Sequence, residues 1–341
     1  MNDTSRRSVP PPRGWLTMAL IALALPMGGC SDPDPDPPPA EGWTEAFDAT
    51  QLGWLLNVWG SSGDDLWAVG GPRDSGVIWR WDGTSWGEVD PGMQVPLVNW
   101  AFGFGPDDIT FVGDEGTVLH YDGSGFTAQT TPTDQNLWGV WGSGPDDLWA
   151  VGGNGRVAGD QVILRYDGTA WTELASPMLE KPGVTAYFKV WGTGSDDVYI
   201  VGSRGVVLHW DGTALSEQLV GASDDLISLW GTSPDNIVAV GGRGNGIVSR
   251  FNGTDWQTET LAPLPGFNGI HMSDPNVATV VGVRGTIIEL NVQTLAPTDQ
   301  SYDTTLDLHA VFRDSTGRLT TVGGSLASIQ PPYRGIALWL E

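Results

Sequence analysis

The chain has 341 residues, with 48 glycines, 24 prolines, 18 tryptophans and one cysteine, and its formal charge is −25. A charge this negative excludes nucleic acid as an expected partner and disfavours direct docking on anionic lipid, because phosphate repels an acidic surface. With a single cysteine the chain has no intramolecular disulfide, so packing must supply its stability.

The N-terminal segment predicts a secretory signal. Arg6, Arg7 and Arg13 precede an apolar run over residues 16–27, which is too short to span a bilayer. The small residues "GG" then lead to Cys30. This order resembles the lipobox of bacterial lipoproteins, in which that cysteine carries the lipid.

The resemblance implies a signal peptide over residues 1–29 and lipid attachment at Cys30. Ser31 after the cysteine favours the outer membrane of a Gram-negative cell envelope. A plain signal peptide is the first alternative, and the "SRR" stretch leaves a twin-arginine signal as the second.

Residues 30–41 form a Pro/Asp-rich stretch that predicts a stiff linker, because proline favours an extended chain and like charges repel. Removal of residues 1–29, which carry three Arg and one Asp, takes the formal charge to −27.

The remainder of the chain is built from an internal repeat. An aromatic anchor, or a histidine in its place, recurs at spacings of 43, 39, 50, 39, 41 and 41 residues. The seven anchors are Trp59, Phe102, Trp141, Trp191, Trp230, His271 and Phe312. A Val-Gly pair ends eleven residues after each anchor, and its glycines are Gly70, Gly113, Gly152, Gly202, Gly241, Gly282 and Gly323. These spacings are typical of β-propeller blades.

Each repeat predicts four short strands, as the third repeat illustrates. Residues 137–142 form the first strand and residues 147–152 the second, on either side of an Asp pair. Residues 162–166 form the third, and Trp171 opens the fourth. The strands are apolar on both faces, which is typical of sheets covered on both sides.

A two-residue pair joins the third strand to the fourth in five repeats: Asp82-Gly83, Asp122-Gly123, Asp167-Gly168, Asp211-Gly212 and Asn252-Gly253. Such pairs predict two-residue hairpins with positive φ at both positions.

The two ends of the chain predict how the ring closes. The seventh repeat ends after its third strand, while Trp43, Thr44 and Glu45 match the start of a fourth strand. We therefore predict an all-β, seven-bladed propeller over residues 42–341, in which a strand at about 42–48 completes the last blade.

The repeats resemble known propeller families. The series "VG..G..L..DG..W" is similar to Asp-box (BNR) and photosystem-assembly-factor repeats, and "AVGG" followed by Tyr166 and Trp171 is similar to kelch repeats. The whole repeat region resembles secreted bacterial propellers that carry "WGS..DD.WAVG". The resemblance implies a fold, and propellers host lectins, enzymes and protein-binding platforms alike.

Propeller topology places the second-to-third and fourth-to-first connections on one face. On this face fall six of the eleven arginines that follow residue 29: Arg73, Arg156, Arg204, Arg243, Arg284 and Arg334. A guanidinium is a planar fork suited to carboxylate or phosphate, so these residues predict an anion-binding ring. The alternative is that each arginine braces its own hairpin or pairs with a neighbouring blade.

The longest irregular segments, residues 175–187 with Lys181 and residues 324–334, belong to the same face. Binding residues concentrate in such loops on rigid scaffolds.

The opposite face carries the Asp pairs Asp64-Asp65, Asp107-Asp108, Asp146-Asp147 and Asp196-Asp197. We expect turn chemistry for them in place of calcium binding, because one pair per blade cannot converge on one ion. His120 and His209 occupy a third-strand position that holds arginine in other repeats, which predicts a structural slot and no metal site. His271 replaces an anchor and should be packed.

No catalytic motif or cofactor motif is present in the sequence. The predicted function is non-enzymatic recognition of a protein or an acidic glycan on the Arg-bearing face, by a monomer without metal or cofactor. The alternative is a glycan-processing hydrolase of sialidase-like architecture, which would need paired carboxylates at the central pocket on that face.

Overall fold

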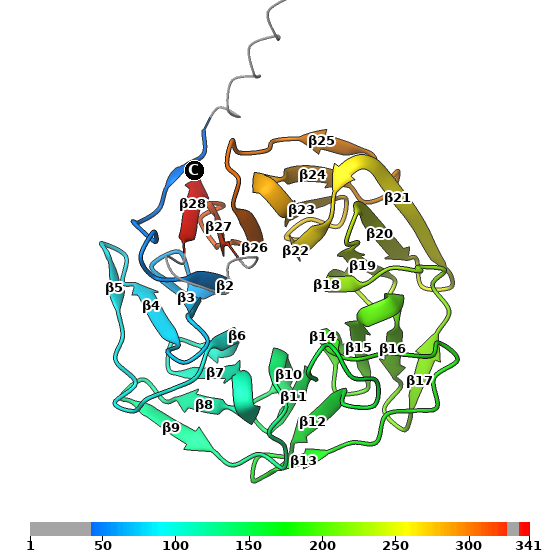
Figure 1. Cartoon of the computed structure of the whole chain (residues 1–341), viewed down its shortest axis with the longest axis horizontal. Coiled ribbons are helices and arrows are strands. Elements are labelled where there is room, and N and C mark those ends of the chain that lie inside the picture. The colour runs from blue at the N-terminus through cyan, green and yellow to red at the C-terminus, as the bar shows by residue number, and fades with distance from the viewer. Residues whose placement is uncertain (1–41, 326–333) are drawn as a thin grey trace, which may run out of the picture. The chain divides into compact units, whose positions relative to one another are not determined.

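The computed structural model describes residues 42–325 and 334–341, which belong to the compact unit Pro39–Glu341. Seven four-stranded antiparallel sheets are arranged in a ring (Figure 1). The chain is therefore a seven-bladed β-propeller, as the repeat predicted. The predicted signal peptide, lipid attachment at Cys30 and linker, and residues 326–333, lie outside the described residues.

Each blade contributes one strand to each of four concentric layers, and the bounds are as follows. The innermost strands are β2 (Trp54–Ser62), β6 (Val98–Gly105), β10 (Leu137–Gly144), β14 (Tyr187–Gly194), β18 (Leu226–Ser233), β22 (Phe267–His271) and β26 (Asp307–Arg313). The second strands are β3 (Asp65–Gly71), β7 (Asp108–Gly113), β11 (Asp147–Gly152), β15 (Asp197–Gly202), β19 (Asn236–Gly241), β23 (Val277–Gly282) and β27 (Leu319–Gly324). The third strands are β4 (Val77–Trp81), β8 (Val118–Tyr121), β12 (Val162–Tyr166), β16 (Val207–Trp210), β20 (Asn245–Phe251), β24 (Ile287–Asn291) and β28 (Gly335–Leu340).

The outermost strands are β5 (Trp86–Glu88), β9 (Phe126–Gln129), β13 (Trp171–Glu173), β17 (Leu215–Gln218), β21 (Trp256–Pro265), β25 (Pro297–Asp299) and β1 (Thr44–Glu45). Three single-turn 3-10 helices connect second to third strands: η1 (Asp114–Gly116), η2 (Ser203–Gly205) and η3 (Val283–Gly285). Among the described residues no helix is long and apolar enough to cross a membrane.

The ring closes through the N-terminal strand, as predicted. Strand β1 pairs antiparallel with β28, where Thr44 lies opposite Trp339 and Glu45 opposite Leu338. Figure 1 shows the blue N-terminal segment running beside the red β28. Trp43 is buried, and it packs in one cluster with Leu308 and Leu338. The last blade is therefore held by both ends of the propeller.

The second-strand glycine is explained by a β-bulge in the innermost strand. In blade 5, Leu226 pairs with Gly241 and Ser228 pairs with Val240, so the register skips Ile227. A Cβ atom at Gly241 would collide with the main-chain carbonyl of Asp225 at the start of β18. All seven innermost strands skip one residue at this position, and all seven Val-Gly glycines face a main-chain carbonyl at the start of the innermost strand. Only glycine fits opposite the bulge.

The glycine that directly follows an anchor is needed for blade-to-blade contact. A Cβ atom at Gly231 would lie 2.6 Å from Cη2 of Trp191, the anchor of the preceding blade. At Gly192 the same substitution would bring Cβ to 2.9 Å from Cη2 of Trp141. In these blades the anchor tryptophan therefore packs on the glycine of the next blade, whereas Met272 and Arg313 stand at the glycine position in blades 6 and 7.

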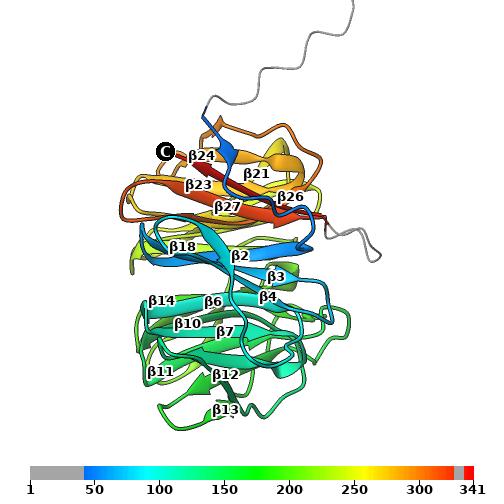
Figure 2. The ribbon, with the colours of Figure 1, turned by 90° about the vertical axis from the view of Figure 1, so that its left-hand side faces the viewer.

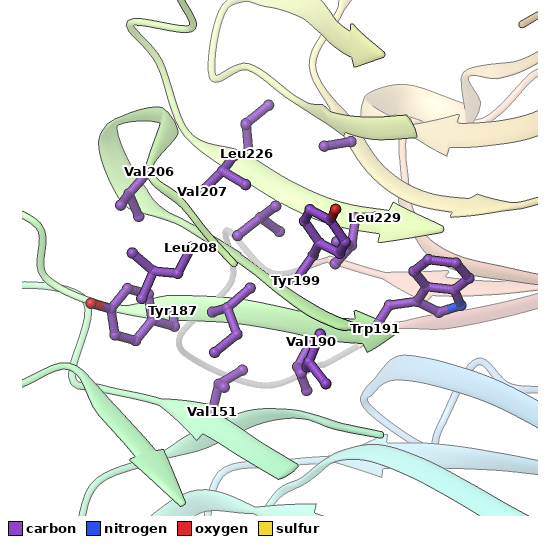
Figure 3. Packing of buried hydrophobic residues seen from close by; sticks show 14 of the residues in the cluster. Val151, Tyr187, Val190, Trp191, Tyr199, Val206, Val207, Leu208, Leu226 and Leu229 are labelled. Carbon is purple, nitrogen blue, oxygen red and sulfur yellow. The ribbon is translucent and has the colours of Figure 1, made fainter. Parts of the chain in front are cut away.

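The blades pack face to face as stacked layers (Figure 2). Every residue of β3 and β19 is buried, as predicted for sheets covered on both sides. Figure 3 shows the contact between blades 4 and 5, where Tyr199 lies beside Leu229. The outermost strands differ from the prediction, because all three residues of β25 are exposed at the edge of the ring.

In the five repeats with an Asp-Gly or Asn-Gly pair the third-to-fourth connections are four-residue turns, so the prediction of two-residue hairpins was wrong. In blade 1 the turn runs from Asp82 to Ser85, between β4 and β5. Oδ1 of Asp82 accepts the main-chain N–H groups of Thr84 (2.9 Å) and Ser85 (2.8 Å). Only Gly83 has positive φ, since the aspartate side chain supplies the turn that a second positive φ would have made.

Trp43→Ala is expected to open the ring by removing the buried side chain next to β1. The variant should lose about 3–5 kcal/mol of unfolding free energy, the usual cost of truncating a buried tryptophan. Urea denaturation of the full chain measures this loss. Thr44→Ala, which changes an exposed residue of the same strand, is the control. Equal losses in both variants would contradict closure through Trp43.

Candidate ligand-binding pocket

The seven bulges aim seven side chains at one central pocket. Each skipped residue stands three positions before an anchor and lines the pocket: Leu56, Asn99, Trp138, Phe188, Ile227, Asn268 and His309. A β-bulge re-aims the side chain of its extra residue, and here it turns one residue per blade toward the axis. The same distortion that requires the Val-Gly glycine therefore builds the site.

The pocket has a volume of about 530 Å³, within the range of small-ligand sites. The second-to-third turns contribute Arg73, Asp114, Gly155, Ser203, Arg204 and Arg243 to its lining. The segments that lead into the innermost strands contribute Leu97, Asn136, Gly183, Thr185 and Asp225, and the first residue of β2 contributes Trp54. The pocket therefore opens on the face where the sequence analysis predicted an anion-binding ring of arginines.

The structure divides the six predicted arginines into two groups. Arg73, Arg204 and Arg243 line the pocket, and we call them the pocket arginines. Arg156, Arg284 and Arg334 occupy the equivalent turns but do not line it, and we call them the non-lining arginines. All six are exposed, and the predicted ring converges on the axis only in part.

Two aspartates just before β18 hold the pocket arginines of blades 4 and 5. Arg204 has a φ of 60° in η2, and its main-chain N–H donates to Oδ1 of Asp225 (2.7 Å). Arg243 donates from Nε to Oδ2 of Asp225 (2.7 Å) and from its main-chain N–H to Asp224 (2.8 Å). The guanidinium of Arg243 also lies 5.8 Å from the centre of the Phe188 ring. Asp225 therefore joins the turns that carry Arg204 and Arg243, so these two arginines also have the structural role that the alternative predicted.

Lys189 is a pocket residue that the sequence analysis did not select. Its side chain crosses blade 3 above Gly139, where a Cβ atom would lie 3.3 Å from Cδ of Lys189. Nζ donates to the main-chain carbonyls of Trp138 (2.7 Å) and Phe188 (3.2 Å) and lies 4.0 Å from the centre of the Trp100 ring. Burial lowers the pKa of the Lys189 ammonium to about 7.

A sequence signal for Lys189 was present. It stands two positions before its anchor, where the other blades have Asn57, Trp100, Gly139, Ser228, Gly269 and Ala310. A lysine in a buried inner strand is unusual unless a partner is supplied, and here the partners are carbonyls of the bulge.

The pocket also holds two carboxylates. Asp114 accepts a hydrogen bond from Nδ2 of Asn99 (2.9 Å). Burial raises the pKa of Asp114, while Asn99 and the charge of Arg73 oppose that rise. Asp225 uses both of its oxygens on Arg204 and Arg243. With three arginines and the partly protonated Lys189 against two carboxylates, the lining carries excess positive charge.

The predicted binding loop over residues 175–187 contributes backbone more than charge. Lys181 donates from Nζ to the carbonyls of Gly205 (2.7 Å) and Ala222 (2.6 Å), so its amine is bound within the scaffold. Gly183 and Thr185 of this loop reach the pocket. Of the second predicted segment, 324–334, residues 326–333 lie outside the described part of the chain.

The Asp pairs on the opposite face make structural contacts. The second aspartate of each pair binds the third-strand basic residue, as in Asp65–Arg80 (2.7 Å) and Asp147–Arg165 (2.8 Å). His120 and His209 make the equivalent contacts to Asp108 (2.9 Å) and Asp197 (2.8 Å), as predicted for a structural slot. Within residues 42–325 and 334–341 no group of three or more His, Cys, Asp and Glu side chains is arranged to hold a metal ion.

Comparisons with known proteins agree on the fold. No protein-family model and no curated protein sequence matches the chain. Among solved structures it is similar to YCF48 from Cyanidioschyzon merolae, at 13% identity and a TM-score of 0.65, over 88% of this chain and 99% of that one. A streptogramin B lyase structure matches at 13% identity and a TM-score of 0.69, over 88% of this chain and 97% of that one. A structure of YCF48 bound to D1 peptide matches at 18% identity and a TM-score of 0.64, over 89% of this chain and 96% of that one.

His271, the histidine among the anchors, makes stability depend on pH. It is packed between Trp230 (4.5 Å between ring centres) and Phe312 (5.1 Å), as predicted. Burial lowers its pKa to about 3, and the charge of Arg313 acts in the same direction. Between pH 6.5 and about 3 the unfolded chain therefore binds more protons than the folded chain, so stability falls as the pH falls through this window.

His271→Phe is expected to flatten this dependence, because phenylalanine already serves as an anchor at Phe102 and Phe312 and takes up no proton. Between pH 6.5 and 4.5 the slope of unfolding free energy against pH should become shallower, by up to about 1.4 kcal/mol per pH unit. Urea denaturation at a series of pH values measures the slope. An unchanged slope would show that His271 is not held neutral.

Proposed function

We propose that this chain is a non-enzymatic binding propeller whose axial pocket takes an anionic group of a protein or an acidic glycan. The observation that carries the proposal is the convergence of Arg73, Arg204, Arg243 and Lys189 on one pocket, in a chain whose formal charge is −25. Most of the acidic surface repels an anion, so the pocket is where one would be held.

The geometry suits a ligand with an anionic part and an apolar part. Guanidinium groups bind carboxylate and phosphate through paired hydrogen bonds. Between the cations, Trp54, Trp138 and Phe188 supply aromatic surface. The Trp138 ring is oriented by its Nε1–H, which donates to the carbonyl of Gly153 (2.8 Å).

The similar structures support the class of function without naming a ligand. YCF48 has a structure with a bound D1 peptide, which supports a peptide as one form of the proposed ligand. The streptogramin B lyase has the same fold and is named as an enzyme. Function must therefore be argued from the pocket of this chain.

A hydrolase would need two carboxylates that both act on one bond. Asp114 has the raised pKa expected of a general acid. The carboxylate of Asp225, by contrast, is committed to Arg243 and to the main chain of Arg204. The pocket therefore supports binding better than hydrolysis.

The proposed setting is the outer membrane of a bacterial envelope, with the propeller tethered by lipid on Cys30. The support is the order of basic, apolar and small residues before the only cysteine, followed by the Pro/Asp-rich stretch.

Cys30→Ser is expected to move the full chain from the membrane fraction to the soluble fraction of bacterial cells, because serine cannot carry the thioether-linked lipid. Immunoblots of the two fractions measure the shift, with Ser31→Ala as the control. Membrane association of the Cys30→Ser variant would contradict the anchor.

The pocket itself is tested by a triple variant, Arg73→Gln, Arg204→Gln and Arg243→Gln. Its binding to an array of acidic glycans, polyanions and acidic peptides should be at least about tenfold weaker than that of the unchanged chain, since three charges facing the ligand are removed. Binding of the unchanged chain should also weaken with salt.

The matched control carries Arg156→Gln, Arg284→Gln and Arg334→Gln, which remove the same charge from the same face outside the pocket. Melting temperatures show that each variant is folded. Equal weakening in both triple variants would contradict the pocket as the site, and no binding by the unchanged chain would contradict the function.

A further inference from the structure

Exposed apolar side chains gather on the face that carries the pocket. Among the described residues, four of the five exposed large apolar side chains lie in connections of this face: Met93, Val157, Met178 and Leu219. The fifth, Phe104, lies near the end of β6 on the opposite face. Apolar groups that gather on one exposed face are typical of an interaction surface, so the pocket face has a binding surface wider than the pocket.

Two of these side chains, Met178 and Leu219, are held outward by their neighbours, and we call them the apolar pair. Met178 is 97% exposed and Leu219 is 67% exposed. The next residue along the chain, Leu179 in one case and Val220 in the other, packs in the hydrophobic cluster of blades 3 to 5. Because the packed neighbour fixes the path of the chain, the loop itself leaves both apolar side chains in solvent.

The two segments that carry the apolar pair are joined by two hydrogen bonds. The main-chain N–H of Glu180 donates to Oε2 of Glu217 (2.5 Å). Nζ of Lys181 donates to the main-chain carbonyl of Ala222 (2.6 Å). The apolar pair therefore belongs to one surface, which is formed by the loop after β13 and the connection after β17.

This surface leads directly to the pocket. Gly183 stands five residues after Met178 and lines the pocket, and a Cβ atom at Gly183 would lie 3.6 Å from Cδ of Arg204. Nζ of Lys181 also donates to the main-chain carbonyl of Arg204 (3.2 Å). Five residues of extended chain span at most about 18 Å, so one short segment of a ligand can reach both the apolar pair and a pocket arginine.

Charge determines which part of a ligand each region accepts. The pocket arginines attract an anionic group. The apolar pair offers hydrocarbon and one thioether, and the exposed carboxylate of Glu180 beside it repels an anion. The ligand must therefore carry an acidic group and an apolar group a short distance apart. A protein segment combines the two in its side chains, whereas an acidic glycan carries hydroxyls or carboxylates on every sugar and no aliphatic side chain.

We propose that the pocket face docks a protein segment whose acidic side chain enters the pocket while an apolar side chain, within about five residues of it, covers Met178 and Leu219. Methionine suits this role, because its flexible side chain adapts to the shape of a partner and is enriched at protein interfaces. This inference rests on the proposed binding function, and it selects the protein over the acidic glycan.

Calorimetric titration of the full chain with three probes tests the inference. The leucine peptide is a decapeptide with blocked ends, two glutamates at its centre, glycine spacers and two leucines at each end. The serine peptide replaces every leucine with serine, and the third probe is a galacturonate trisaccharide. The leucine peptide should bind at least about tenfold more tightly than either of the others, because only its leucines can be buried against the apolar pair.

The double variant Met178→Ser and Leu219→Ser removes the apolar pair and changes only exposed side chains. It should bind the leucine peptide about tenfold more weakly and the serine peptide unchanged. Met93→Ser is the matched control, since Met93 is also exposed on this face but lies between blades 1 and 2. The pocket-arginine triple variant should weaken the binding of both peptides. Melting temperatures verify that each variant folds.

Three results would overturn the docking of a protein segment while leaving the binding function intact. They are equal binding of the two peptides, a preference for leucine that survives in the double variant, and galacturonate binding tighter than that of either peptide. If no probe binds, or if the pocket-arginine variant binds all three probes like the unchanged chain, the proposed function fails as well.

Discussion

The bulge opposite the Val-Gly glycine is the contact on which the remaining structure depends. At each of the seven positions a main-chain carbonyl at or just before the start of the innermost strand occupies the space of a Cβ atom, so glycine is the one residue that fits. The bulge then shifts the register by one residue and turns the side chain of the skipped residue out of the blade toward the axis. Seven repetitions of one local distortion therefore supply one pocket-lining residue from each blade.

This arrangement separates the scaffold from the site. Anchors such as Trp141 and Trp191 pack on the glycines of the following blades, and on the opposite face the second Asp of each pair binds the basic residue of the third strand. These positions recur because the same contact is made in several blades. The side chain at the bulge position makes no such repeated contact, so the residue type there differs between blades, as at Leu56, Asn99, Trp138 and His309. Similar structures of low identity can therefore share the ring while each chain supplies its own pocket.

Acidic side chains position the basic side chains of the pocket. Asp225 accepts hydrogen bonds from the main chain of Arg204 and from the guanidinium of Arg243, and so links the turns of two blades. Lys189 lies across Gly139 and against Trp100, where burial brings its pKa to about 7. The result is a cationic, partly aromatic hollow in a protein that is otherwise strongly acidic.

The sequence by itself determined the blade count, the closing strand at Trp43 and the face that carries the arginines, because these follow from spacing and from alternation of turns along the chain. It also predicted the packed role of His271 and the structural slot of His120 and His209. It predicted the wrong turn type at Asp82-Gly83. The residue pair alone does not show that the carboxylate of Asp82 bonds to the turn, so that Asp82 itself needs no positive φ. Only the tertiary structure decided which arginines share a pocket and that Lys189 joins them. Those facts depend on how seven repeats are rotated about one axis, and positions about 40 residues apart meet there only once the ring is closed.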